Sequence, residues 1–237
     1  MKKNDSYINK IYSIEESIDY SVYDKIWDLS NFEFNYEYVS QPWIEESKIE
    51  LFCKALNVIA ENIVPRIKVA SGEIEWAKGF IGERKLKKKI ILIGVKSTSE
   101  SRDWPLEKWK FLIDKLKNLN DNIIIVDKEY RWDDEELIFF NNHSLRELFS
   151  LVAISDLVLC NDSGLLHIAG SLDKRVLAIF GPTDPKVRCI YQSSYEIHND
   201  IGILPPWYDR KKYIDYFESI AVEDVERKVI EILENGI

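Results

Sequence analysis

The chain has 237 residues, of which 46% are hydrophobic and 12% aromatic. This composition is sufficient for a packed core, and it excludes a disordered or collagen-like chain. The formal net charge is −9. Because an acidic chain has no general attraction for phosphate backbones, we expect no nucleic-acid partner, and an anionic ligand would need a local cationic site.

The cysteines and the apolar runs indicate the class of protein. Cys53, Cys160 and Cys189 are odd in number and lack C-x-x-C spacing, so neither a disulfide framework nor a zinc site is indicated. We expect no metal and no cofactor. The start of the chain lacks the apolar segment of a signal peptide, and no run approaches the ~18 apolar residues of a membrane span. These features predict a cytoplasmic protein without a transmembrane segment.

The first 88 residues have an irregular α/β pattern. Strands are expected at Lys25–Leu29 and Arg66–Ala70, and helices at Glu45–Glu61 and around Glu73–Ile81. A basic run, Arg84–Lys89, then precedes a strongly apolar segment. Such a run is typical of a solvated linker, so we place the boundary there, between residues 1–88 and 89–237.

Residues 89–237 alternate between apolar runs and helical patterns. The expected strands are Ile90–Val95, Asn122–Asp127, Asp156–Asn161 and Arg175–Phe180. The expected helices begin at Pro105, Ser144 and Ser163, and a last one covers Val222–Leu233. Nearly continuous apolar strands are typical of a parallel sheet that is covered on both faces. The second region is therefore predicted to be a doubly wound α/β domain.

Polar loops follow three of the expected strands. They are Ser97–Pro105, Asn161–His167 and Gly181–Pro185. Ligands of open parallel sheets bind beyond the carboxyl ends of the strands, where these loops should converge. The second loop either forms an anion site at a helix N-terminus, with Gly164 allowing close approach, or merely caps a structural helix with Asp162 and Ser163.

The other two loops are also ambiguous when taken singly. Ser97, Thr98 and Arg102 suit a phosphate clamp because arginine presents several fixed donors, although an ordinary polar loop above Trp104 fits at least as well. Thr183 either donates to a phosphate or closes a rigid turn. Together, the three loops suit a nucleoside diphosphate whose charge is stabilised by helix N–H groups and arginine.

The combination of motifs resembles glycosyltransferase family nine, the ADP-heptose:lipopolysaccharide heptosyltransferases. The motifs are SRDWPLEKWKFLIDKL and the block from SLRELF to FGPTDP, which joins Asp-Ser-Gly-x-x-His to Gly-Pro-Thr-Asp-Pro within residues 90–190. The resemblance implies a GT-B fold of two Rossmann-like domains. It also implies a cytoplasmic enzyme, either free or peripheral at the inner face of the membrane, that transfers a sugar from a nucleotide-sugar donor, typically ADP-heptose, to a glycan or lipid-linked acceptor.

The resemblance also assigns roles residue by residue. It places Ser97 and Thr98 against the diphosphate, and Arg102, where the family has lysine, at the leaving group. Four residues of the helix-start motif surround the sugar and phosphates: Asp162, Ser163, Gly164 and His167. Thr183 matches the turn threonine, and Glu129 is the candidate for holding the ribose, with Asp127 as the alternative.

The N-terminal region departs from the family pattern. The family's opening strand, glycine-rich first turn and aspartate base have no counterpart here, so we expect a truncated acceptor-side domain over residues 1–88. Three functions remain open. They are an inverting, metal-independent transferase, with or without a partner chain that supplies the acceptor half; a non-catalytic nucleotide-sugar-binding protein or donor-binding subunit; and, less consistent with Gly-Pro-Thr-Asp-Pro, a nucleotide-sugar epimerase.

Overall fold

The computed structural model describes residues 16–26, 47–59, 64–84, 89–119, 122–127, 134, 137–198 and 216–234. The chain forms two compact units, Met1–Glu61 and Asn62–Ile237. The division therefore lies earlier than the boundary that we predicted at the basic run Arg84–Lys89. The reason is helix α3 (Ser71–Glu83), which precedes the basic run but packs on helix α5 (Leu145–Ile154) of the second unit.

The first unit contains two short helices in its described part. Helix η2 covers Tyr20–Val22, and helix α2 covers Lys48–Leu56, inside the predicted range of Glu45–Glu61. Ser47 begins α2 with a capping box, since its hydroxyl accepts from the Glu50 amide and the Glu50 carboxylate accepts from the Ser47 amide. Most of the strand predicted at Lys25–Leu29 lies outside the described residues.

The second unit is built on a six-stranded parallel sheet with the order β3-β2-β1-β4-β5-β6. The strands are β1 (Ile90–Gly94), β2 (Asn122–Val126), β3 (Ile138–Phe140), β4 (Leu157–Asn161), β5 (Val176–Phe180) and β6 (Ser194–His198). From β1 the chain adds strands first on one side and then, with β4, on the other. The switch between β1 and β4 is where doubly wound sheets bind their ligands.

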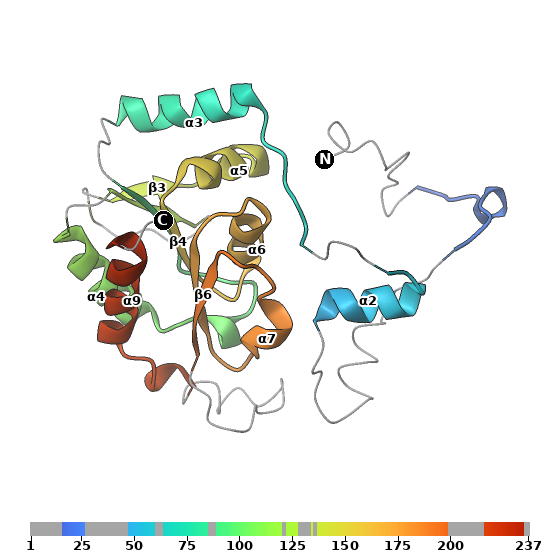
Figure 1. The fold of residues 1–237 in the computed structure, drawn as a ribbon. Helices are drawn as coiled ribbons and strands as arrows, with labels where there is room; N and C mark the ends of the chain where they lie inside the picture. Colours follow the sequence, from blue (N-terminus) through green and yellow to red (C-terminus); the bar gives the residue numbers. More distant parts are fainter. Residues whose placement is uncertain are drawn as a thin grey trace. The chain divides into compact units, whose positions relative to one another are not determined.

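Helices cover both faces of this sheet (Figure 1). On one face lie α4 (Leu106–Lys117) and α9 (Val222–Glu234), and on the other lie α3, α5 and α6 (Gly164–Ser171). Alternate residues of β1 serve the two cores, since Ile91 and Ile93 pack with α4 and α9 while Leu92 faces the opposite layer. The predicted doubly wound α/β fold is confirmed.

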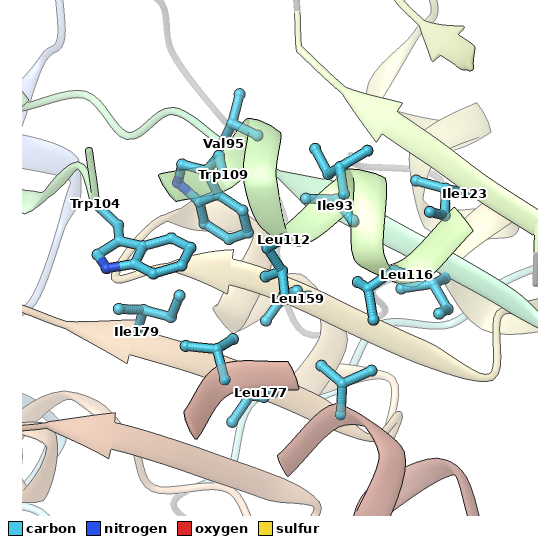
Figure 2. Close-up of a cluster of buried hydrophobic side chains, with 14 of the residues drawn as sticks. Ile93, Val95, Trp104, Trp109, Leu112, Leu116, Ile123, Leu159, Leu177 and Ile179 are labelled. Atoms are coloured by element: carbon cyan, nitrogen blue, oxygen red, sulfur yellow. The ribbon is translucent and has the colours of Figure 1, made fainter. Parts of the chain in front are cut away.

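The core beneath α4 supports the loop that follows β1. Figure 2 shows Trp109, Leu112 and Leu116 of α4 packed over strand residues, with Trp104 next to them. The Trp104 and Trp109 rings meet edge to face with their centroids 5.1 Å apart, and both side chains are buried. The end of the loop is thus anchored in the hydrophobic core by aromatic packing.

Three elements differ from the sequence-based expectation. Residues 66–70 form no strand, because the Ile67 amide donates to the Ser171 carbonyl at the end of α6 rather than to a neighbouring strand (3.0 Å). Strands β3 and β6 were not predicted. The first has three residues and the second, Ser-Tyr-Glu-Ile-His, is largely polar, as suits an edge strand with one side open. None of the helices in the described part of the chain is both long and apolar enough to cross a membrane.

Candidate functional site

The loop after β1 carries the first group of predicted site residues. It contains helix η3 (Glu100–Arg102), and its start is closed by Ser97, whose hydroxyl donates to the Ser99 carbonyl (2.7 Å) and accepts from the Ser99 amide (3.1 Å). The Ser97 hydroxyl is therefore used in shaping the turn. Its role at a diphosphate remains a prediction.

Arg102 extends from η3 across the gap to the loop after β4. Its guanidinium donates to the Thr98 hydroxyl (2.7 Å) and to the Asp162 carboxylate (3.4 Å), and its side chain is 21% exposed. Among the described residues, its Nε is buried and has no hydrogen-bond partner. A buried unpaired donor costs roughly 1–3 kcal/mol, so an acceptor placed at this atom would be stabilising.

Asp162 joins all three predicted loops. Its side chain is 2% exposed, and the same oxygen, Oδ2, accepts from Arg102 and from the Thr183 hydroxyl (3.0 Å) in the turn after β5. Arg102, 60 positions before Asp162, and Thr183, 21 positions after it, thus bond to the same carboxylate. The structure therefore brings together Thr98, Arg102, Asp162 and Thr183 at the carboxyl edge of the sheet, on both sides of the switch between β1 and β4.

Helix α6 begins beside this cluster. Ser163 occupies its N-cap position, but its side chain accepts no hydrogen bond from the first turn, so the alternative in which this hydroxyl caps the helix is not observed. The Ser163 hydroxyl is buried, and its polar neighbour is the Cys160 thiol, a weak partner whose pKa is raised by burial. The N–H groups of the first turn are left without this side-chain acceptor and carry the positive end of the helix dipole.

Gly164 is the first residue of α6. Among the described residues, a Cβ added at this position would meet no atom within 4 Å apart from its own helix backbone and chain neighbours. By contrast, a Cβ at Gly94 would lie 2.7 Å from Leu165, so that glycine is needed for close packing of α6 on β1. Packing against the described residues therefore gives a reason for glycine at position 94 but none at position 164.

His167 belongs to a separate group one turn further along α6. Its Nδ1 lies 3.1 Å from the Tyr191 hydroxyl. Tyr191 is buried, which raises the pKa of its hydroxyl, and its ring occupies the space where a Cβ at Gly170 would lie. Tyr191 could not be predicted as a site residue, because nothing in its local sequence marks it as a neighbour of His167.

The ribose candidates are placed only in part. Glu129 lies outside the described residues, whereas Asp127 directly follows β2 and is partly buried. Within the described ranges no three His, Cys, Asp or Glu side chains gather as metal ligands. The three cysteines are free thiols.

Comparisons with known proteins identify the family of this chain. Residues 19–203 match the family model described as glycosyltransferase family 9 (heptosyltransferase). The chain belongs to glycosyltransferase family 9. Over 43 residues it is 42% identical to lipooligosaccharide heptosyltransferase 2 of Haemophilus influenzae, a match that covers 18% of this chain and 12% of that protein.

Solved structures of family 9 proteins share the fold. A family 9 glycosyltransferase from Veillonella parvula superposes with a TM-score of 0.67 at 17% identity, covering 83% of this chain and 63% of the other. E. coli ADP-heptose lps heptosyltransferase II gives a TM-score of 0.59 at 17% identity, covering 76% and 56%. The predicted GT-B-like α/β fold is confirmed, and the chain spans somewhat more than half the length of these relatives.

Proposed function

We propose that this chain binds a nucleoside-diphosphate sugar, with ADP-heptose as the expected donor, and transfers its sugar with inversion to a glycan or lipopolysaccharide-type acceptor. The observation that carries the proposal is the convergence of three loops on Asp162 at the switch point of the sheet. Family membership supports a transferase, and one relative with the same fold is named as an ADP-heptose enzyme.

Two features of the site suit the diphosphate. The planar guanidinium of Arg102 presents several fixed donors, and its buried Nε is an unused donor among the described residues. The N-terminus of α6 adds backbone N–H groups and a helix dipole next to Gly164, where there is room for a phosphate. The interaction of both groups with the diphosphate becomes stronger as negative charge develops on it. They therefore stabilise the transition state more than the bound donor.

Asp162 has a different part in this proposal. A carboxylate repels phosphate, and its Oδ2 already accepts from Arg102 and Thr183. It therefore orients the guanidinium, while its second oxygen can accept from a sugar hydroxyl. His167, whose ring is held by the Tyr191 hydroxyl, contacts the donor from the same helix in this proposal.

The transfer step uses these groups without a covalent intermediate. The acceptor oxygen bonds to the anomeric carbon as the bond between that carbon and the diphosphate oxygen breaks. The acceptor proton passes to a base, to which we assign no residue, and the electron pair leaves with the diphosphate. Arg102 and α6 bear the charge of this leaving group, which is the task that a metal performs in other transferases.

A transfer assay tests the proposal. The purified chain is incubated with ADP-heptose and candidate acceptors, with and without added divalent cations, and ADP release and acceptor glycosylation are both measured. We expect stoichiometric ADP and glycosylated acceptor of inverted anomeric configuration. Saturable donor binding without turnover, or turnover only after a second chain is added, would instead identify a donor-binding protein or subunit.

A further inference from the structure

Asn161 is a buried polar residue to which the motif comparison assigns no role. It is the last residue of β4, and its side chain is fully shielded from solvent. Its Nδ2 donates to the Val95 carbonyl at the end of β1 (2.9 Å), and its Oδ1 accepts from the Trp104 amide (3.1 Å). One side chain thus holds the backbone at both ends of the loop that separates these two residues.

Asp103 completes the arrangement from within that loop. Its Oδ1 accepts from the Ser97 amide (2.7 Å) and lies 3.4 Å from Asn161 Nδ2. Its Oδ2 pairs with Lys96 (3.2 Å), and its side chain is 10% exposed. The start of the loop is therefore tied to its end through Asp103, and both are tied to β4 through Asn161.

The residues held in this way are those of the candidate site. Ser97, Thr98 and Arg102 all lie between Val95 and Trp104. We propose that Asn161 and Asp103 are positioning residues that hold this loop in its ligand-binding conformation before the ligand arrives. The inference rests on the proposed function. It adds that donor affinity depends on two side chains that act through the loop, because their polar groups are bonded to its backbone.

The chemistry of the pair explains why an amide is required at residue 161. A side-chain amide supplies one acceptor and a donor group, and here both ends are used. A carboxylate of the same shape would place an oxygen against the Val95 carbonyl and the Asp103 carboxylate. The loop would then lose its pre-formed conformation, and ligand binding would have to include the cost of ordering it.

The test compares Asn161→Asp with Leu157→Ala at the opposite, fully buried end of the same strand. Amide hydrogen exchange, thermal unfolding and ADP affinity are measured on the whole chain. For Asn161→Asp we expect exchange at Ser97 and Trp104 to accelerate about tenfold more than in β2, and the ADP Kd to rise about tenfold. For Leu157→Ala we expect a comparable or larger fall in Tm with the Kd within about twofold of wild type.

Asp103 provides the second variant, in case Asn161→Asp does not fold. Asp103→Ala should raise the Kd and loop exchange in the same direction, and Asp103→Asn, which keeps an acceptor for the Ser97 amide, should restore most of both. Uniform acceleration of exchange, or a Kd that simply follows Tm in all variants, would overturn the positioning role. Failure of the wild-type chain to bind ADP would overturn the proposed function instead, and the exchange pattern alone would then decide whether the pair holds the loop.

Discussion

The two ends of the same parallel sheet use their polar groups differently. At the amino end, Asp156 accepts from the Ile90 amide (2.7 Å), and Arg175 donates to the Ile232 carbonyl at the end of α9 (2.8 Å). Lys89 donates to the neighbouring Leu233 carbonyl. These groups satisfy strand and helix termini that the fold itself leaves open, so their contribution is to stability.

At the carboxyl end, part of the polar capacity is unused among the described residues. Arg102 Nε is buried without a partner, and the space beyond Gly164 holds no protein atom within 4 Å of an added Cβ. Ser163 leaves the first turn of α6 uncapped by its side chain. Charged and buried polar groups occur at both ends of the sheet, so these properties alone do not identify a site. What distinguishes the carboxyl end is the convergence of three loops on the Asp162 carboxylate.

The largest expected effect is that of Asp162→Ala. It removes the carboxylate that holds Arg102 and Thr183, and it leaves a largely buried guanidinium uncompensated. We expect a loss of about 3 kcal/mol in the free energy of unfolding, the low end for a broken buried pair, together with loss of ADP binding. Urea unfolding and calorimetry measure the two. Asp114→Ala on the exposed side of α4 should change stability by less than ~0.5 kcal/mol.

Arg102→Ala tests the functional end more selectively. We expect ADP binding to weaken by at least about 1.5 kcal/mol, or more than about tenfold in Kd, because a charge-assisted hydrogen bond is lost. Arg102→Lys keeps the positive charge but loses the planar guanidinium, so its ADP affinity should lie between those of wild type and Arg102→Ala. Unchanged affinity in Arg102→Ala would remove this residue from the site.

Arg175→Ala is the matched change at the amino end. It removes a donor to the α9 carboxyl terminus, so we expect a loss of about 1 kcal/mol in unfolding free energy. ADP affinity should stay within about twofold of wild type. If Arg175→Ala weakened ADP binding as much as Arg102→Ala, the two ends of the sheet would not differ in their role in binding.

Gly164→Ala separates packing from ligand contact. Since an added Cβ meets no protein atom within 4 Å, we expect unfolding free energy to change by no more than about 0.5 kcal/mol. A weaker ADP affinity would show that the ligand occupies the space. Gly170→Ala, whose Cβ would lie 2.1 Å from the Tyr191 ring, should instead lower stability measurably. If ADP binds Gly164→Ala as tightly as wild type, the diphosphate does not approach here.

The smallest expected effect is that of the partly exposed ion pair between Glu73 of α3 and Arg146 of α5. Hydrogen bonds from Arg146 and from the Ala70 amide lower the pKa of Glu73 below its ordinary value of 4.5. Its stabilising contribution is therefore fully present above that value and is lost as pH falls through the lowered pKa. We expect the stability difference between wild type and Glu73→Gln to shrink between pH 7 and about pH 3 in urea unfolding. A constant difference would contradict this assignment.

Much of the second unit was predictable because its signals are local. Four apolar runs, the capping box at Ser144 and the loops after β1, β4 and β5 all lie in continuous sequence. The contacts that organise the site are not local. Nothing in the sequence around Asn161 indicates that its amide bonds to Val95 and Trp104, and Tyr191 is 24 residues from His167. The prediction of a strand at residues 66–70 was wrong because the Ile67 amide donates to the Ser171 carbonyl at the end of α6. This long-range contact is visible only in the tertiary structure.

Calorimetric titration of the whole chain with ADP and with an ADP-sugar tests whether the carboxyl end of the sheet binds the nucleotide donor. We predict saturable binding of one ligand per chain, with the affinity reduced more than about tenfold in Arg102→Ala and unchanged in Arg175→Ala. Absence of binding by either nucleotide in the millimolar range would contradict the account.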